Sequence, residues 1–301
     1  MLKRICFLFV CCPLWASAAS SVTIHDSLGQ HTFHHIPQRV IALNWSATGN
    51  LLALGITPIA IADTHGYQIW AREPTLAQSI VNIGTRDAPN IERIAQLKPD
   101  LIIIAGSQSE LLSKLRPIAP VLMFKNFSRH HNNAKAATQT FMTLATLFHK
   151  RSVAKQKLTQ METQLTQWKN QIKAHFHGHP PQVSCVRFNT TALVWIYGDN
   201  SMPQYALEKL GLKPALPQPA TKWGVTQKKV IELAAIGQGV LLYFKPFSQQ
   251  QKLFKTPLWQ AMPFVQDHKI ASLPATWTYG GPLSIQTIAS SITQQLLTIE
   301  P

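Results

Sequence analysis

The feature that most constrains the fold is a long segment without a helix-breaking residue. No proline or glycine occurs between Pro120 and Gly178, although the chain has 20 prolines and 14 glycines. Apolar side chains recur in it at spacings of three and four residues, as on one face of a helix, at Leu158, Met161, Leu165, Trp168 and Ile172. A helix over residues 134–176 is about 65 Å long at the helical rise per residue. Such a helix can connect one domain to the next.

The residues before this segment alternate between strand-like and helix-like patterns. The apolar runs that predict strands are Val40–Leu43, Ile59–Ala62, Leu101–Ala105 and Val121–Phe124. The stretches that predict helices are Ala47–Leu54, Ile91–Leu97 and Ser109–Leu115. Strands that alternate with helices favour a mostly parallel α/β sheet.

The residues after the segment repeat two features of the first part. Leu51, Leu54-Gly55-Ile56 and Pro58 match Leu207, Leu210-Gly211-Leu212 and Pro214 at the same spacing. Ile91-Glu92 likewise matches Ile231-Glu232, ahead of the strand-like run Val240–Phe244. Two echoes in the same order indicate two lobes of similar topology.

The predicted fold class is therefore α/β, with two α/β lobes of mostly parallel sheets joined by one long interlobe helix. We place the N-terminal lobe at residues 20–130, the long linking helix at 131–178 and the C-terminal lobe at 179–301.

The first nineteen residues have the pattern of a cleavable secretory signal peptide. Lys3 and Arg4 precede the apolar run Ile5–Trp15, and the small residues Ala16-Ser17-Ala18 follow as a cleavage site. We expect cleavage after Ala18 or Ala19. The alternative is a lipoprotein anchored through Cys11, after Leu8-Phe9-Val10.

After cleavage at either position, Cys185 is the only cysteine that remains, so the exported chain cannot form an internal disulfide. Its place in an apolar strand predicts a buried thiol.

The charge balance is basic, with 28 lysines and arginines against 13 acidic residues. Removal of Lys3 and Arg4 lowers the formal net charge of +15 to +13. The lysines are spread from Lys98 to Lys269 and no nucleic-acid-binding motif occurs, so we expect no nucleic-acid partner. An anionic ligand, an anionic cell envelope or simply solvated surface charge remains open.

Several fragments together resemble a known family. LLALGITPIAIADT, IWAREP, GTRDAPNIE, TPLWQAMPFV and TWTYGGPLS, in this order, resemble the periplasmic solute-binding proteins that deliver iron siderophores and cobalamin to ABC importers. The resemblance is strongest to the ferric-hydroxamate (ferrichrome-type) members and runs from Arg39 to about Ile292. It implies a monomer in the periplasm that binds a ferric siderophore in a shallow cleft between the lobes. It also implies modest closure, no catalysis, no cofactor and transfer of the cargo to an inner-membrane ABC permease.

The resemblance also implies which side chains bind the cargo. A siderophore already satisfies the ferric ion, so the protein needs no metal ligands and recognises the outside of the complex. Arg86 matches the ligand-binding arginine of the family, and a planar guanidinium suits the oxygens of the chelate. The aromatic candidates, which would cover the apolar surface of the complex, are Trp45, Trp70, Trp223, Trp277 and Tyr279. Core packing is the alternative for Trp45 and Trp70, and Trp168 and Trp259 are expected to be structural.

One loop departs from the family pattern. The hydroxamate-binding relatives carry a ligand-binding tyrosine after the strand equivalent to Leu101–Ala105, whereas this chain reads Gly106-Ser107-Gln108-Ser109. We expect Ser107 or Gln108 to replace the tyrosine as a hydrogen-bond donor. Neither supplies an aromatic face, so the departure bears on which siderophore is bound.

The family docks on its permease through one acidic residue on each lobe. Glu92 matches the first of these. Glu232, from the internal echo, is the candidate for the second, although the alignment places that acid nearer Ile231.

Histidines supply a competing hypothesis, in which the chain is a zinc or other metal-ion binding protein of a related fold. The histidines concerned are His34, His35, His130, His131, His175, His177 and His179. Because they fall near the start of the chain and at the two ends of the predicted linking helix, we expect none to face the cleft. An exported enzyme is the other alternative, but no G-x-S-x-G, P-loop or Rossmann glycine pattern occurs.

Overall fold

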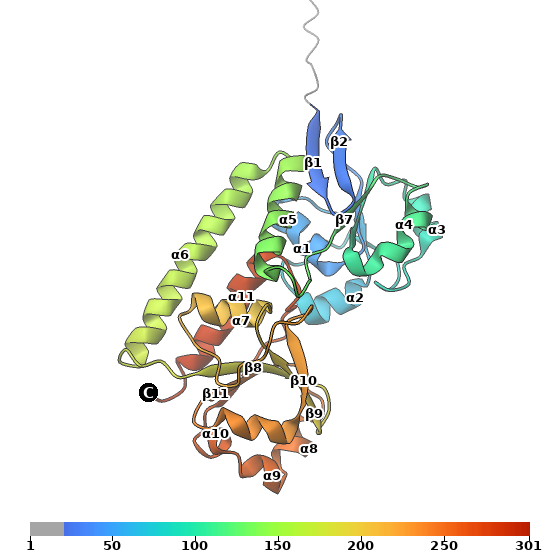
Figure 1. Cartoon of the computed structure of the whole chain (residues 1–301). Helices are drawn as coiled ribbons and strands as arrows, with labels where there is room; N and C mark the ends of the chain where they lie inside the picture. The colour runs from blue at the N-terminus through green and yellow to red at the C-terminus, as the bar shows by residue number, and fades with distance from the viewer. Residues whose placement is uncertain (1–20) are drawn as a thin grey trace, which may run out of the picture.

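The computed structural model describes residues 21–301, so the expected signal peptide and the alternative lipid anchor at Cys11 lie outside the described residues. The chain forms two lobes, one above the other in Figure 1, with a long helix along one side of both. Each lobe is built on a five-stranded sheet. The structure confirms the predicted α/β class with two lobes.

The first sheet has the strand order β5-β4-β3-β6-β7, and every neighbouring pair is parallel. Its strands are β3 (Val40–Ala42), β4 (Ala60–Ile61), β5 (Val81–Asn82), β6 (Leu101–Ala105) and β7 (Val121–Phe124). Its α-helices are α1 (Trp45–Ala53), α2 (Thr64–Gly66), α3 (Ile91–Gln96) and α4 (Leu112–Leu115), with a π-helix at Tyr67–Ala71 and a 3-10 helix at Gly106–Leu111. Four of the five strands are those that the sequence predicts, and the two-residue strand β5 is additional.

An antiparallel hairpin precedes this sheet and packs on its edge. It consists of β1 (Val22–Asp26) and β2 (Gly29–Phe33). The Oδ2 atom of Asp26 accepts a hydrogen bond from the backbone N–H of Met123 at 2.7 Å, and Oδ1 lies 3.0 Å from Nε2 of His31. One carboxylate therefore fastens the hairpin to β7.

The second sheet has the order β10-β9-β8-β11-β12. Its strands are β8 (Val183–Phe188), β9 (Leu193–Tyr197), β10 (Val225–Lys229), β11 (Val240–Phe244) and β12 (Ile270–Leu273). β8, β11 and β12 are parallel, whereas β9 is antiparallel to both of its neighbours. This sheet is thus mostly parallel with one reversed strand, because β8 and β9 are joined by a short turn rather than by a helix.

The internal echo corresponds to the same turn at the end of two helices. Gly55 follows α1 with φ of 77°, and Gly211 follows α7 (Met202–Lys209) with φ of 76°. In each turn the residue after the glycine donates its backbone N–H to a helix carbonyl five positions earlier, Ile56 to Leu51 and Leu212 to Leu207. Glycine is favoured at this position because the left-handed conformation carries no Cβ penalty there.

The predicted single helix over residues 134–176 is wrong, because the structure has two helices there. α5 spans Asn133–Leu147 and α6 spans Arg151–His175. Between them His149 adopts φ of 54°, and the backbone N–H groups of His149 and Lys150 donate to Thr146 and Ala145. These two hydrogen bonds form a Schellman turn with histidine where glycine is usual, so no glycine or proline marks the end of α5.

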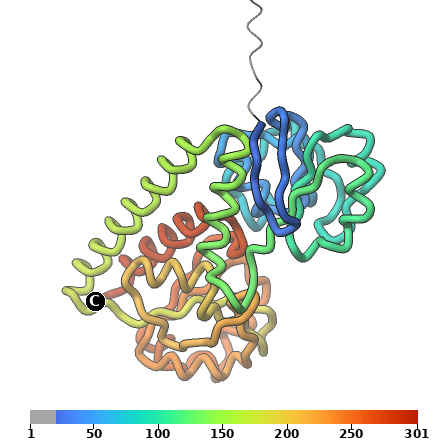
Figure 2. Tube along the Cα trace, turned by 45° about the horizontal axis from the view of Figure 1, so that its top comes forward, coloured from blue at the N-terminus to red at the C-terminus, as the bar shows by residue number. Residues whose placement is uncertain are grey.

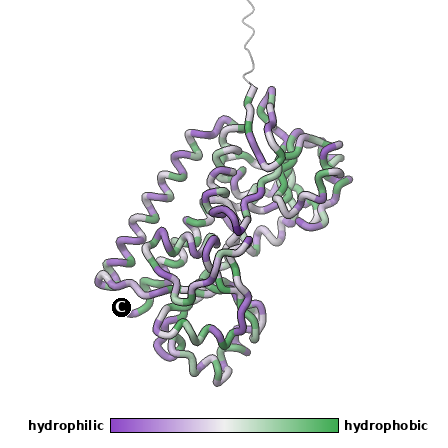
Figure 3. Tube along the Cα trace, in the orientation of Figure 1, coloured by the Kyte–Doolittle hydropathy of each residue, from purple (hydrophilic) through white to green (hydrophobic). Residues whose placement is uncertain are grey.

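Because the chain turns back between α5 and α6, both of these helices and a third one connect the lobes (Figures 1 and 2). α6 buries Ala154 in the first lobe's core and Met161, Leu165 and Ile172 in that of the second. α5 likewise contributes to both cores, and α11 (Pro282–Leu296) packs along α6 and reaches α5. Figure 3 shows that the outer face of α6 is mostly hydrophilic. The interlobe helix is thus amphipathic, with its apolar stripe inward.

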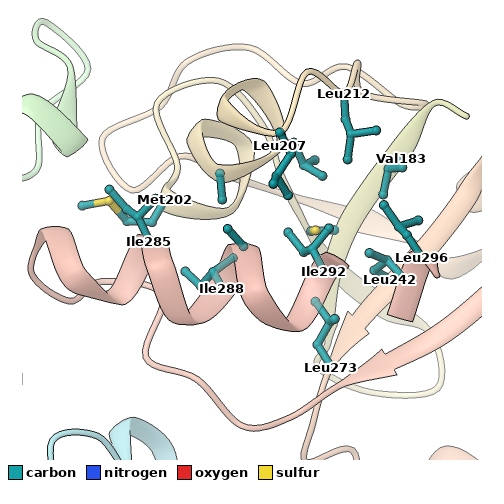
Figure 4. Close-up of a cluster of buried hydrophobic side chains, with 14 of the residues drawn as sticks. Val183, Met202, Leu207, Leu212, Leu242, Leu273, Ile285, Ile288, Ile292 and Leu296 are labelled. Carbon is teal, nitrogen blue, oxygen red and sulfur yellow. The ribbon is translucent and has the colours of Figure 1, made fainter. Parts of the chain in front are cut away.

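The core of the second lobe lies on both faces of its sheet. On one face α7 and α11 enclose apolar side chains from β8, β11 and β12, as Figure 4 shows for Val183, Leu207, Leu242 and Ile292. Cys185 belongs to this cluster and is fully buried, as expected, and burial raises the pKa of its thiol.

On the other face, Trp259 packs in a second cluster with the short helices α8 (Gln250–Phe254), α9 (Pro257–Gln260) and α10 (Pro263–Gln266) and a 3-10 helix at Val230–Ile236. Trp259 is thus structural, as expected. Over residues 21–301, no helix is both long enough and apolar enough to cross a membrane.

Candidate functional site

A cavity of about 1130 Å³ lies between the lobes. Its first-lobe wall includes Asn44, Ala105 and Lys125, which stand at the carboxyl ends of β3, β6 and β7. The second-lobe wall includes Arg187, near the end of β8, and the loop that follows β12. The carboxyl ends of parallel strands commonly form binding sites, because the loops that follow the strands converge there. We call this cavity the cleft.

Arg86 reaches the cleft from a tight loop after β5. Gly84 begins the loop with φ of 92° and forms an isolated bridge with Pro89. The Cζ atom of Arg86 lies 3.9 Å from the ring centroid of Trp45 and 4.9 Å from that of Trp277. Its Nε lies 3.8 Å from Oδ2 of Asp63. Burial lowers the pKa of the guanidinium, and the nearby carboxylates of Asp63 and Asp87 partly oppose this shift. Because the ordinary pKa of arginine is so high, the group stays charged.

Gln108 positions the Arg86 loop and does not line the cleft. Its side chain is 5% exposed; Nε2 donates to the carbonyls of Arg86 at 2.7 Å and Leu43 at 2.8 Å, and Oε1 accepts from the N–H of Ala105. All these partners are backbone groups, so the amide has no donor left to offer a ligand from where it stands. The expectation that Gln108 donates to the cargo is therefore corrected, whereas Ser107 is exposed and lines the cleft.

Four of the five predicted aromatic residues form a continuous row across the cleft, and the fifth, Trp70, lines the cleft outside this row. The ring centroids of Trp45 and Trp277 are 4.6 Å apart, those of Trp277 and Tyr279 are 5.3 Å apart, and those of Tyr279 and Trp223 are 5.6 Å apart. Phe127, which the sequence did not single out, contacts both Tyr279 and Trp223. The row joins the first lobe to the loops of the second lobe.

The two ends of this row differ in exposure. Trp45 is 3% exposed and donates its Nε1–H to the carbonyls of Ala62 and Asp63, so it is both core and wall. Trp223 is 39% exposed, which is unusual for so large an apolar side chain. Burial raises the pKa of the Tyr279 hydroxyl, which therefore stays protonated and able to donate. The row thus changes from a rigid base at Trp45 to an open rim at Trp223.

Sequence reasoning missed a second guanidinium in the cleft, that of Arg187. Its Nη2 donates to the carbonyl of Thr276 at 3.1 Å and its Nε to the hydroxyl of Tyr197 at 3.2 Å. Its Cζ lies 5.2 Å from the ring centroid of Trp70, which stands on the first lobe. An arginine near the carboxyl end of an otherwise apolar strand was the signal that was available. Sequence analysis selected Arg86 alone, so the structure adds a second guanidinium to the cleft.

The cleft is basic. Lys125, Lys222 and His131 line it together with the two arginines, and among residues 21–301 no aspartate or glutamate does. His131 contradicts the expectation that no histidine faces the cleft; its Nε2 lies 3.1 Å from the carbonyl of Asn126. In the part of the chain that is described, no group of three histidine, cysteine or acidic side chains is arranged to hold a metal ion. The zinc hypothesis thus has no support from geometry.

Two asparagines, the buried Asn133 and the half-buried Asn200, tie the lobes together. The backbone N–H of Asn133 donates to Oδ1 of Asn200, and its Nδ2 donates to the carbonyls of Asn200 and Lys222. Asn200 in turn donates its Nδ2 to the carbonyl of Ser128 at 2.6 Å. Because Lys222 precedes Trp223, these hydrogen bonds also hold in place the loop that carries the exposed indole of Trp223.

The two candidate docking acids lie on different lobes and differ in their surroundings. Glu92 is exposed in the first turn of α3, and within residues 21–301 no basic side chain lies within ion-pair distance of it. Glu232 is paired with Lys228, with Nζ 3.1 Å from Oε2, and accepts from the N–H of Lys229. The hydrogen bond from Lys228 is the main cause that lowers the pKa of Glu232. The neighbouring Ile231 is 52% exposed.

Comparisons with known proteins agree with this architecture. The sequence profile of the periplasmic binding protein family matches residues 40–276. The iron(3+)-hydroxamate-binding protein FhuD of Escherichia coli K12 is 32% identical over 250 residues, which cover 82% of this chain and 83% of that protein. The Fe(3+) dicitrate-binding periplasmic protein FecB of the same organism is 29% identical over 286 residues, which cover 92% of this chain and 90% of that protein.

A solved structure is also similar. Fe3+–Desferal-bound FhuD from Vibrio cholerae superposes with a TM-score of 0.86 at 44% identity, and the match covers 88% of this chain and 99% of that one.

Proposed function

The chain belongs to the periplasmic binding protein family, and from this premise we propose that it captures a ferric siderophore of the hydroxamate type in its cleft. It then delivers the cargo to the permease of an ABC importer. We further propose that it acts in the periplasm as a monomer, catalyses no reaction, and needs no cofactor besides its cargo.

The observation that carries the proposal is the composition of the cleft. A ferric hydroxamate complex presents an apolar organic surface and oxygens that carry partial negative charge around the metal. Tryptophan and tyrosine rings suit the first, and guanidinium groups suit the second, because their N–H groups form charge-assisted hydrogen bonds. The cleft has both on facing walls, and its volume lies slightly above the usual range of small-molecule sites, which ends at about 1,000 Å³.

On the same chemical grounds, we propose a role for each residue that the sequence selected. Arg86 and Ser107 meet the hydroxamate oxygens, and Trp45, Trp70, Trp223, Trp277 and Tyr279 cover the apolar surface of the complex. Glu92 on the first lobe and Glu232 on the second contact basic residues of the permease. Of the two acids, Glu92 is the stronger candidate, because Glu232 already has Lys228 as its partner.

Titration with ferrichrome tests the proposal. Trp223, Trp277 and Trp70 stand in the cleft, so a bound iron complex quenches their fluorescence in a saturable manner. The expected result is saturable quenching without chemical change of the ferrichrome. Absence of quenching by ferrichrome and by other ferric hydroxamates, together with saturable binding of zinc, would overturn the proposal.

A further inference from the structure

Arg187 differs from Arg86 in having no acidic partner. Two of its N–H groups are used by neutral acceptors, the carbonyl of Thr276 and the hydroxyl of Tyr197. In residues 21–301 no carboxylate lies within 4 Å of it. A guanidinium has five N–H donors, so three remain for a ligand. A half-buried cation held in one orientation without a counter-ion is costly unless an anion joins it.

The surroundings of Arg187 fix the direction in which those donors point. Its Cζ lies over the rings of Trp70 and Phe244, at 5.2 and 5.5 Å from their centroids. The two hydrogen bonds fix the guanidinium in that position. A pre-oriented planar fork loses little conformational entropy when it binds a carboxylate through two parallel hydrogen bonds.

Two lysines add to the same charge. Lys222, on the second lobe, and Lys125, on the first, are exposed and line the cleft. Neither has a carboxylate within 4 Å in the described part of the chain. Lys125 lies across Gly106, where a Cβ would collide with its side chain. The described residues that line the cleft therefore carry positive charge and include no carboxylate that would balance it.

The positive charge of the cleft is greater than the binding of a ferric trihydroxamate complex requires. Three hydroxamate anions neutralise one ferric ion, so the iron cage has no net charge, and Arg86 suffices to meet its oxygens. We propose that Arg187, assisted by Lys222, forms a second subsite that binds a carboxylate arm of the cargo. The protein then prefers a ferric hydroxamate complex with net negative charge over a neutral or cationic one with the same iron cage. This inference rests on the proposed function and specifies its substrate class.

The test uses three ferric complexes that share one iron cage. Desferrioxamine B ends in a protonated amine; acetylation of that amine removes its charge, and succinylation replaces it with a carboxylate. The expected order of affinity is succinylated, then acetylated, then unmodified. A charge-assisted hydrogen bond accounts for a difference of about tenfold or more between the first and the last. The preference decreases when the salt concentration is raised.

Variants assign the preference to the subsite. Arg187→Gln removes the charge and most of the preference for the succinylated complex, while the acetylated complex still binds. Lys222→Gln, at an exposed position that tolerates substitution, removes part of it. Arg93→Gln makes the same charge change on α3, outside the cleft, and leaves the preference intact.

The outcomes separate the inference from the function on which it rests. Equal affinity for the three complexes, or preference for the cationic one, overturns the inference and leaves the proposed function standing. Failure of all three complexes and of ferrichrome to bind overturns the proposed function. Full retention of the preference in Arg187→Gln overturns the assignment to this residue.

Discussion

The two walls of the cleft each carry an arginine, and the surroundings of the two guanidinium groups differ. Arg86, on the first-lobe wall, lies 3.8 Å from the carboxylate of Asp63 and stacks on Trp45 and Trp277. Arg187, on the second-lobe wall, donates to two neutral groups and, within residues 21–301, has no acidic partner; it also lies over the ring of Trp70. Each arginine thus contacts a tryptophan of the opposite wall. The first charge is partly compensated and the second is left for a ligand.

The difference follows from how each arginine is carried. Arg86 stands on a loop that places its side chain close to Asp63. Gln108 holds this loop by donating a hydrogen bond to the backbone carbonyl of Arg86. Arg187 stands near the end of β8, where its neighbours in the sheet are fixed by strand pairing. A strand residue takes its partners from whatever the adjacent strand offers, here the hydroxyl of Tyr197. Two guanidinium groups in one cleft can therefore have separate roles.

The greatest change in stability is expected when the hydrogen bonds of Asn133, which hold the two walls together, are removed. Asn133→Ala leaves the partly buried carbonyls of Asn200 and Lys222 without their donor, so we expect a loss of about 3 kcal/mol in the free energy of unfolding. Urea denaturation measures it. Asn170→Ala, at an exposed position on α6, is the control and changes stability little. A loss no larger in Asn133→Ala than in the control would show that the walls are held by other contacts.

The next effect tests whether the two walls share one aromatic row. Trp277 contacts Trp45 on one side and Tyr279 on the other, and it also lies near Arg86. We expect Trp277→Ala to weaken ferrichrome binding by about 2.5 kcal/mol, as for a central aromatic anchor. Calorimetric titration measures the dissociation constant. Trp168→Ala on α6, outside the cleft, should leave it unchanged, and a similar loss in both variants would point to general destabilisation.

Removal of the first-lobe charge should have a comparable but smaller effect. Arg86→Ala removes charge-assisted hydrogen bonds to the chelate, so we expect a loss of about 2 kcal/mol in binding free energy. The loss should be similar for the succinylated and the unmodified ferric desferrioxamine B, in contrast to the effect of Arg187→Gln. An unchanged dissociation constant would remove Arg86 from the site. Arg93→Ala is the matched control.

A smaller effect is expected from the residue that positions Arg86. Gln108→Leu removes two hydrogen bonds to backbone carbonyls, including that of Arg86, and should weaken binding by about 1 kcal/mol. If Gln108 acts through Arg86, its substitution in the Arg86→Ala background costs almost nothing further. Additive losses in that double-mutant cycle would instead mean that Gln108 acts independently of the arginine.

The smallest effect on affinity concerns a surface away from both walls. Glu92 is exposed on α3 and does not line the cleft, so Glu92→Ala should leave the affinity for ferrichrome unchanged. If Glu92 docks on the permease, the same variant lowers uptake of iron-loaded ferrichrome by cells. Glu110→Ala, another exposed acid of the first lobe, is the control. Normal uptake by cells that carry Glu92→Ala would count against the docking role.

Much of the fold could be predicted, because burial imposes its periodicity on the chain. The parallel strands β3, β4, β6 and β7 read as apolar runs, since both faces of their sheet are covered. The end of α5 could not be predicted in the same way. His149 adopts the left-handed conformation although it is not glycine. The burial of Ala154 and Leu158 in the first lobe's core offsets the free-energy cost of that conformation. Such an offset depends on contacts distant in sequence.

The class of the fold and its two lobes could be predicted from the sequence, as could six residues that line the cleft, Arg86, Trp45, Trp70, Trp223, Trp277 and Tyr279. These follow from local patterns and from a resemblance that local patterns carry. The packing of the lobes was needed to show that Gln108 points to the backbone, that Arg187 joins the cleft and that, among residues 21–301, Arg187 has no acidic partner. The orientation and charge balance of a side chain depend on which distant groups come within a few ångströms of it, and that is settled only when the lobes pack together.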